Sequence, residues 1–358
     1  MEFLLVFSIY AFLFRHILLA IASLAVAATF HPTYIPSAAL LGLAYMVETY
    51  REEKSLKNVI LIGSLSFTFL LPVVLYMSLV FAPTTPELWQ QAQDIIVNFR
   101  IPHHSFPEIW LSKQPVASTV QILVMVVGIH LMRGTRLFLP LCIPFIAGVL
   151  LTFLQVLGGD NTVAFVAPWR ISAFLVPVCT SIILARIICY CLPEEPQHRP
   201  SRYIAIFLSL AVLAFCTVRG AAITKDRFAD RDATAGMMDF VKANKQPSDV
   251  YLVPFNTTEI WRMQRFWKFR LYTGAPIFIN EKSHPYKDLE VLEWYRRVIL
   301  AQQFYQATDA SRCETLPSLR GNEKITHIVF APEHPPIPCA EMEELYNDGA
   351  HSVYRILP

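Results

Sequence analysis

The feature that most constrains this chain is a series of long apolar runs that fills its first 218 residues and then stops. An α-helix needs about 20 apolar residues to cross the roughly 30 Å hydrocarbon core of a bilayer. Eight runs approach or reach that length: Phe3–Phe14, Ile17–Phe30, Ile35–Tyr50, Asn58–Ala82, Val116–Met132, Leu137–Leu157, Ile171–Leu192 and Tyr203–Val218. The pattern predicts an α-helical polytopic membrane domain of about seven or eight helices over residues 1–218.

The remainder of the chain has a different composition. Only 16% of all residues are charged, but charges become frequent from Arg219, and no later apolar run could span a bilayer. Short apolar strands alternate there with helical patterns, as in an α/β layer structure. We therefore expect a water-soluble α/β domain over residues 219–358. Its clearest helix is Leu289–Phe304, with an expected buried stripe of Leu292, Tyr295, Ile299 and Leu300.

The first two runs are each too short to span comfortably. They read either as two short helices around Arg15 and His16 or as one long helix that carries Arg15. An unpaired arginine inside a membrane is costly, so the sequence favours a turn at this point.

Positively charged loops set the expected orientation, because short loops rich in Lys and Arg stay on the cytoplasmic side. Three such loops alternate with loops that carry few positive charges, and their basic residues are Arg51, Lys54, Lys57, Arg133, Arg136, Arg199 and Arg202. We expect a multi-pass membrane protein, with residues 83–115 and 219–358 outside the cytoplasm. The net charge of +2 gives no reason to expect nucleic acid as a partner.

The seven cysteines fall into two groups. Five lie in or beside the apolar runs, where a free cysteine behaves as a small apolar side chain. Only Cys313 and Cys339 lie in the expected outer domain, where an isolated pair is a candidate disulfide. Two reduced core thiols are the alternative. Cys189 and Cys191 lack the spacing and the neighbours of a metal site, so none is predicted.

The outer loop 83–115 carries the main candidate binding site. Leu88, Trp89, Ala92, Ile95, Ile96 and Phe99 recur at helical spacing, whereas Gln90, Gln91, Gln93, Asp94 and Asn98 fill the other face. This pattern is typical of a helix that lies in the membrane interface. Arg100, His103 and His104 follow directly, at the expected depth of lipid phosphates, and guanidinium and imidazole groups suit a phosphate. Simple anchoring in the headgroup layer is the alternative reading.

Three further polar residues are expected on the same side. Arg170 follows Pro168 and Trp169 at the start of a span and is a second candidate for phosphate binding, or an interfacial anchor. Asp160 and Asp94 are weak candidates for a catalytic acid or base, and Asp160 is equally an ordinary turn residue. No phosphate-binding loop, dinucleotide-binding or metalloprotease motif is present, so the sequence leaves the cofactor unknown.

The order of parts resembles the later half of GT-C type glycosyltransferases, which use lipid-linked sugar donors. More closely, Arg100-Ile-Pro-His-His104, Pro168-Trp-Arg-Ile-Ser-Ala173 and Glu293-Trp-Tyr-Arg-Arg297 resemble an uncharacterised family of bacterial, several of them cyanobacterial, multi-pass membrane proteins. The resemblance implies a bacterial inner membrane as the location and a polyprenyl-phosphate-linked sugar as the ligand. GT-C enzymes carry an acid in their first outer loop, but His31–Tyr34 has none. The resemblance therefore leaves three expectations open for a missing N-terminal half: truncation, a misplaced start, or a split gene whose other product is a partner subunit.

Three functions stay open on the sequence. The first is a glycosyltransferase-like protein that handles a lipid-linked phosphate or sugar. The second is a non-catalytic membrane component whose outer domain binds a partner or a glycan. The third is a transporter, for which the spans carry few of the mid-membrane ionisable residues that such proteins use. All three have membrane lipids as their surroundings.

Overall fold

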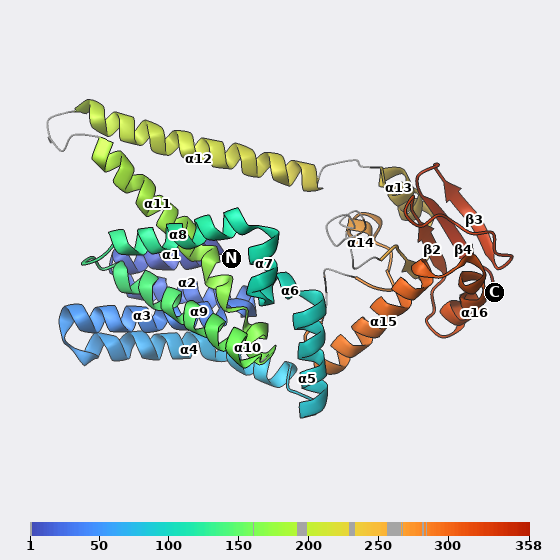
Figure 1. The fold of residues 1–358 in the computed structure, drawn as a ribbon, viewed down its shortest axis with the longest axis horizontal. Helices are drawn as coiled ribbons and strands as arrows, with labels where there is room; N and C mark the ends of the chain where they lie inside the picture. Colours follow the sequence, from blue (N-terminus) through green and yellow to red (C-terminus); the bar gives the residue numbers. More distant parts are fainter. Residues whose placement is uncertain are drawn as a thin grey trace. The chain divides into compact units, whose positions relative to one another are not determined.

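The computed structural model describes residues 2–159, 161–191, 199–228, 233–255, 266, 268–280, 283 and 285–358. It divides into two compact units, Met1–Leu210 and Ala211–Pro358, each of which is described by itself (Figure 1). The division falls inside helix α12 (Arg199–Phe228), a little before the change of composition at Arg219.

Unit 1 is helical throughout its described residues. Its elements before α12 are α1 (Glu2–Leu13), α2 (Ile17–Phe30), η1 (Pro32–Tyr34), α3 (Ile35–Glu53), α4 (Leu56–Val80), α5 (Pro86–Asp94), η2 (Ile95–Arg100), α6 (Pro102–Ser105), α7 (Pro107–Lys113), α8 (Pro115–Leu131), α9 (Phe138–Gly158), α10 (Asn161–Val166), η3 (Pro168–Ile171) and α11 (Ser172–Cys191). In its core, Phe12 stacks on Tyr45 with ring centroids 4.1 Å apart, and Ser8 hydrogen-bonds the Tyr45 hydroxyl at 2.9 Å.

The chain turns sharply between α1 and α2. Arg15 adopts a left-handed backbone conformation with φ +63°, and the two helices pack along each other as a hairpin (Figure 1). The predicted turn is therefore confirmed, and the single long helix is excluded. The hairpin also places Glu2 and His31 at the same end of the bundle.

Four helices are long and apolar enough to cross a membrane. They cover Leu56–Val80, Phe138–Gly158, Asn161–Tyr190 and Ile206–Lys225 in the described part of the chain. The pair α7 and α8 would add a fifth if it forms one span bent by 111°. This is fewer than the seven or eight expected, because α1 and α2 are short and the last turns of α3 carry Glu48, Arg51, Glu52 and Glu53.

The segment 83–115 folds as a chain of short helices, each beginning at a proline. Pro86, Pro102, Pro107 and Pro115 each stand in the first turn of a helix, where the missing N–H costs nothing. The expected interfacial helix runs on from α5 into the π-helical η2 and ends at Arg100. One detail of its predicted polar face is wrong: Gln93 is only 6% exposed and accepts from the Thr162 hydroxyl at 3.5 Å.

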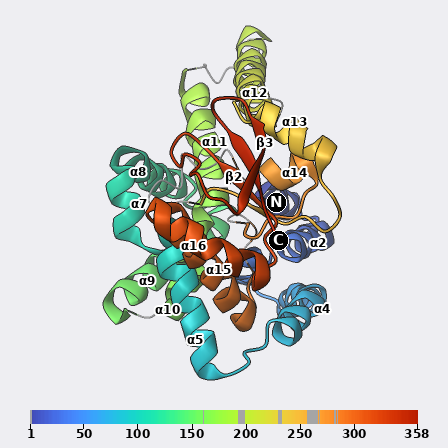
Figure 2. The ribbon, with the colours of Figure 1, turned by 90° about the vertical axis from the view of Figure 1, so that its right-hand side faces the viewer.

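Unit 2 contains a four-stranded sheet in the order β1-β2-β4-β3. Strand β1 is parallel to β2, and the other two pairs are antiparallel. Figure 2 shows α13 and α14 on one side of the strands and α15 and α16 on the other. The elements are α13 (Ala235–Asn244), β1 (Tyr251–Leu252), α14 (Phe269–Thr273), α15 (Asp288–Gln306), α16 (Asp309–Gly321), β2 (His327–Phe330), β3 (Met342–Asn347) and β4 (Ser352–Ile356).

Helix α15 forms where the sequence predicts it, but the buried stripe is displaced. The side chains that pack inward are Val291, Trp294, Val298, Ala301, Phe304 and Tyr305, not the stripe expected. Tyr305 anchors the helix in this rotation, because its hydroxyl lies within hydrogen-bonding distance of two strand carbonyls, Leu252 in β1 at 3.1 Å and Val329 in β2 at 2.8 Å.

A disulfide joins Cys313 of α16 to Cys339, with Cα atoms 5.5 Å apart and 26 positions between them in sequence. It ties α16 to the segment that precedes β3. In the chain-entropy model, a closed loop of this size contributes about 3 kcal/mol to stability.

Candidate functional site

The residues predicted to bind phosphate come from two separate parts of unit 1. Arg100 ends η2, His103 and His104 lie in α6, and Arg170 lies in η3. Helix α6 packs against both η2 and η3, so the fold brings the two parts together. The His103 and His104 rings lie with centroids 4.2 Å apart. We call these four residues the Arg/His cluster.

The charges that act on the two histidines are cationic. Burial, followed by the charges of Arg100 and Lys113, lowers the pKa of His103. Burial of part of the ring, and then the charges of His103, Arg170 and Arg100, lower the pKa of His104, although that side chain remains partly exposed. The lowered pKa values favour the neutral form of both imidazoles. An anion placed among these groups would raise both pKa values.

Arg170 follows a strained turn. Ala167 has φ +51° directly before Pro168, although a residue before proline favours an extended backbone. Helix α9 approaches this turn closely, because a Cβ added to Gly148 would lie 2.2 Å from Cδ1 of Ile171. The close approach of α9 thus fixes the turn that carries Arg170.

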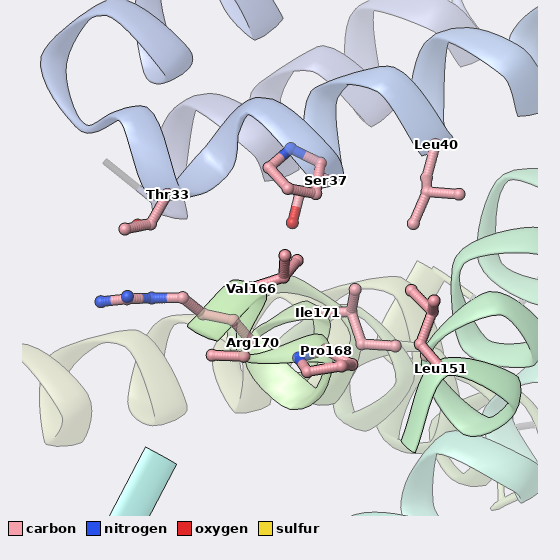
Figure 3. Close-up of a pocket in the computed structure, with 11 residues that line it drawn as sticks. Thr33, Ser37, Leu40, Leu151, Val166, Pro168, Arg170 and Ile171 are labelled. Carbon is pink, nitrogen blue, oxygen red and sulfur yellow. The ribbon is translucent and has the colours of Figure 1, made fainter. Parts of the chain in front are cut away.

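A small pocket borders Arg170 (Figure 3). It lies between η1 with the start of α3, the middle of α9, and the α10–η3 turn, and its volume is about 20 Å³, about enough for one water. Leu40, Leu151 and Ile171 line its apolar end, and the Arg170 guanidinium lies toward Thr33 (Figure 3). The pocket is too small to hold a ligand headgroup, so the candidate site is the polar surface around Arg170.

Sequence reasoning missed three residues on the other side of Arg170. Tyr34 is 4% exposed, and its hydroxyl donates to Glu2 Oε1 at 3.1 Å. Burial and the Glu2 carboxylate raise the pKa of Tyr34, whereas Arg170 lowers it; the Arg170 Cζ lies 5.8 Å from the centre of the Tyr34 ring. The charge of Arg170 also contributes, after burial, to a lowered pKa of His31. These contacts join positions distant in sequence, so no local pattern could have indicated them.

Among the described residues, no hydrogen bond or ion pair joins a candidate acid to the Arg/His cluster. Asp94 Oδ1 accepts a hydrogen bond from Asn161 Nδ2 at 2.6 Å, which ties α5 to α10. Asp160 lies outside the described residues. A catalytic role for either carboxylate stays a prediction. In the described part of the chain, no group of three or more His, Cys, Asp or Glu side chains could hold a metal ion.

Aromatic pairs hold the helices of segment 83–115 against the α10–η3 segment. Trp110 of α7 stacks on Trp169 of η3, with ring centroids 5.4 Å apart and planes 12° apart. Trp89 of α5 meets Phe165 of α10 edge to face at 6.1 Å. A hydrogen bond from the Gln155 amide of α9 to the Ser105 carbonyl adds a third link. The cluster is therefore built on a packed scaffold, although its elements are short.

The comparisons with known proteins touch only unit 2. A family model described as a domain of unknown function, DUF6798, matches residues 232–301. This stretch includes α13 and most of α15. The matched segment includes Glu293, which pairs with Arg296 at 2.8 Å and with Arg297 at 2.7 Å. No curated protein matches the chain.

Proposed function

We propose that unit 1 lies in a membrane and that its Arg/His cluster, on the non-cytoplasmic face, binds the phosphate of a lipid-linked phosphate or sugar. Unit 2 would lie on that same side, as in the later half of a GT-C type glycosyltransferase. The proposal concerns binding, and the acid that a transfer reaction needs is not assigned.

The observation that carries the proposal is the position of Arg170. It lies within electrostatic range of His104, and among the described residues no carboxylate forms an ion pair with it. A guanidinium presents a planar fork of donors that fits phosphate oxygens. The two neutral histidines next to it can each donate one further hydrogen bond.

The surface of unit 1 supports its placement in lipid. Large apolar side chains on the long helices are widely exposed, such as Leu79 at 77% and Leu157 at 82%. Water-soluble proteins seldom expose large contiguous apolar patches. The same helices separate the Arg/His cluster from the loops rich in Lys and Arg, as the expected orientation requires.

The test of binding uses the full chain in lipid nanodiscs and a fluorescent polyprenyl phosphate. A charge-assisted hydrogen bond is worth about 1.5–3 kcal/mol, so Arg170→Ala and Arg100→Ala should each weaken binding about 10-fold or more. Lysine at either position should restore only part of the loss, because the fork is gone. Arg186→Ala, an exposed arginine of α11, is the matched control. Equal affinity in Arg170→Ala and wild type would reduce the cluster to a membrane anchor.

Inorganic phosphate separates a lipid site from a site for free phosphate. A lipid-phosphate site should be competed only weakly by millimolar inorganic phosphate, because the lipid chain adds apolar burial that the free ion lacks. Full competition at that concentration would instead indicate a free-phosphate site.

Orientation has its own test. Fusion of alkaline phosphatase after Pro358 should give an active reporter in bacteria, and fusion after Arg136 an inactive one, because the enzyme needs an oxidising compartment. The reverse pattern would place the Arg/His cluster on the cytoplasmic face.

A further inference from the structure

Helices α1 and α2 are much shorter than the other apolar helices of unit 1. Helix α2 has 14 residues and α1 has 12, so at 1.5 Å per residue they measure about 21 Å and about 18 Å. Helix α4, against which α2 packs, has 25 residues, and α9 has 21, which gives about 37 Å and about 31 Å. Only the longer two match the roughly 30 Å of hydrocarbon in an ordinary bilayer.

Both ends of α2 are polar and cannot sink into hydrocarbon at low cost. The backbone leaves the helix at Arg15, which has φ +63°, and again at His31, which is extended. Arg15 and His16 are exposed. An arginine can lift its charge toward water along its own side chain, but the carbonyl groups at a helix end have no such reach and need water or another donor. The apolar layer at this hairpin is therefore about 20 Å thick.

The outward surface of the hairpin is a row of aromatic rings on α1. Phe3, Phe7, Tyr10 and Phe14 follow one another with ring centroids 6.1, 6.2 and 4.6 Å apart. Phe3, Tyr10 and Phe14 are 74%, 54% and 60% exposed. The row covers the whole length of the helix, so it presents an apolar band of about 18 Å that ends at the polar turn.

A lipid layer is the partner that this surface fits. Helix α2 packs against α4, and α4 exposes large apolar side chains such as Phe67 at 67% and Leu79 at 77%, so the hairpin continues a surface that belongs in lipid. Exposed polar residues border the aromatic row at both ends, with Glu2 at one and Arg15 and His16 at the other. Two headgroup layers require such a pair of polar borders, whereas a protein partner does not.

We propose that α1 and α2 form a face of unit 1 that holds the bilayer locally about 10 Å thinner than its surroundings, and that this face therefore collects lipids with short acyl chains. A bilayer meets a hydrophobic surface shorter than itself by thinning, at a cost that rises with each ångström of mismatch. Short chains lower that cost and so exchange preferentially into this face. The inference rests on the membrane placement in the proposed function, but it is independent of the Arg/His cluster.

Quenching of tryptophan by brominated lipids measures which lipids touch a chosen position. Tyr10→Trp places a tryptophan on the short hairpin, and Phe67→Trp places a matched one on α4, in both cases at an exposed aromatic position. Each full-length variant is reconstituted with an equimolar mixture of phosphatidylcholines with short (about 14-carbon) and long (about 22-carbon) chains, brominated in turn. The unsubstituted chain supplies the signal of the native tryptophans, which is subtracted.

The short lipid should be enriched about 3-fold over the long one at position 10, and neither should be enriched at position 67. Equal quenching by the two lipids at position 10 overturns the thinning. Quenching at position 67 with none at position 10 also overturns it, because another protein chain then covers the hairpin. No quenching at either position overturns the membrane placement itself, whereas a failure to bind polyprenyl phosphate leaves the inference intact.

Discussion

Arginines lie near both ends of helix α3, in contrasting surroundings. Near its C-terminal end, two arginines each form an ion pair at 2.6 Å: Arg51 with Glu48, and Arg136 with Glu52. At its N-terminal end, about 28 Å away along 19 residues, Arg170 has no ion pair among the described residues. The first end is neutralised by the protein, whereas the second leaves a guanidinium available to a ligand.

The difference separates two uses of arginine. Arg136 is held by Glu52 and lies over the Phe12 ring at 4.3 Å, so it connects the α8–α9 loop to α1 and α3. Arg170 makes its described contacts with Tyr34 instead. We therefore expect substitutions at the C-terminal end to lower stability and those at the N-terminal end to lower ligand affinity. Two experiments test this contrast.

The larger effect is expected from Glu52→Gln. The Arg136 side chain is only 13% exposed, and removing the partner of a buried charge is costly. Because the pair is not fully buried, we expect a loss of about 2–3 kcal/mol in the free energy of unfolding, measured by thermal or chemical unfolding in detergent. Arg170→Ala should cost less than about 1 kcal/mol, as a substitution outside such a pair.

Glu53→Gln is the control for this experiment, because Glu53 lies 3.8 Å from the exposed Arg15 and such a pair contributes little. The contrast between the two ends fails if Glu52→Gln destabilises the chain no more than Arg170→Ala does.

The smaller effect is a pH dependence at the N-terminal end. A histidine with a lowered pKa contributes stability above its ordinary pKa of about 6.5, and this stability is lost as the pH falls through the lowered value. His103 and His104 have lowered pKa values, so acid should destabilise the free protein. A bound phosphate favours the protonated rings, so its affinity should rise by about 3- to 10-fold between about pH 7.5 and about pH 5.5.

His104→Gln should flatten that rise in affinity while it keeps a hydrogen-bond donor at the position. Binding titrations at a series of pH values give the comparison directly. An affinity that is constant over this range, or a rise that His104→Gln leaves intact, would mean that the histidines do not face the phosphate.

Much of the architecture could be predicted because it depends on local pattern. Apolar run length indicates the membrane-length helices, and prolines mark the breaks in segment 83–115. The sequence also singles out Cys313 and Cys339 as a pair, and the structure joins them. Helix α15 forms over nearly the predicted range.

What could not be predicted depends on contacts between distant segments. The rotation of α15 is anchored by the Tyr305 hydroxyl, which lies within hydrogen-bonding distance of two strands, and the burial of Gln93 by its neighbour on α10. Strand β3 was not expected, since its residues Met342–Asn347 are mostly polar and it pairs only at the edge of the sheet. Glu2 lies in an apolar helix, and nothing in the pattern around it indicates the contact with Tyr34.

The close approach of α9 to η3 has a consequence for how such sequences diverge. Position 148 has no room for a Cβ because Ile171 fills the space, and Ile171 follows directly after Arg170. A lineage that gains a side chain at 148 must therefore shorten residue 171 in compensation or shift the turn that carries the arginine. Substitutions at positions 148 and 171 would then be correlated, because both positions determine where the charge of Arg170 lies.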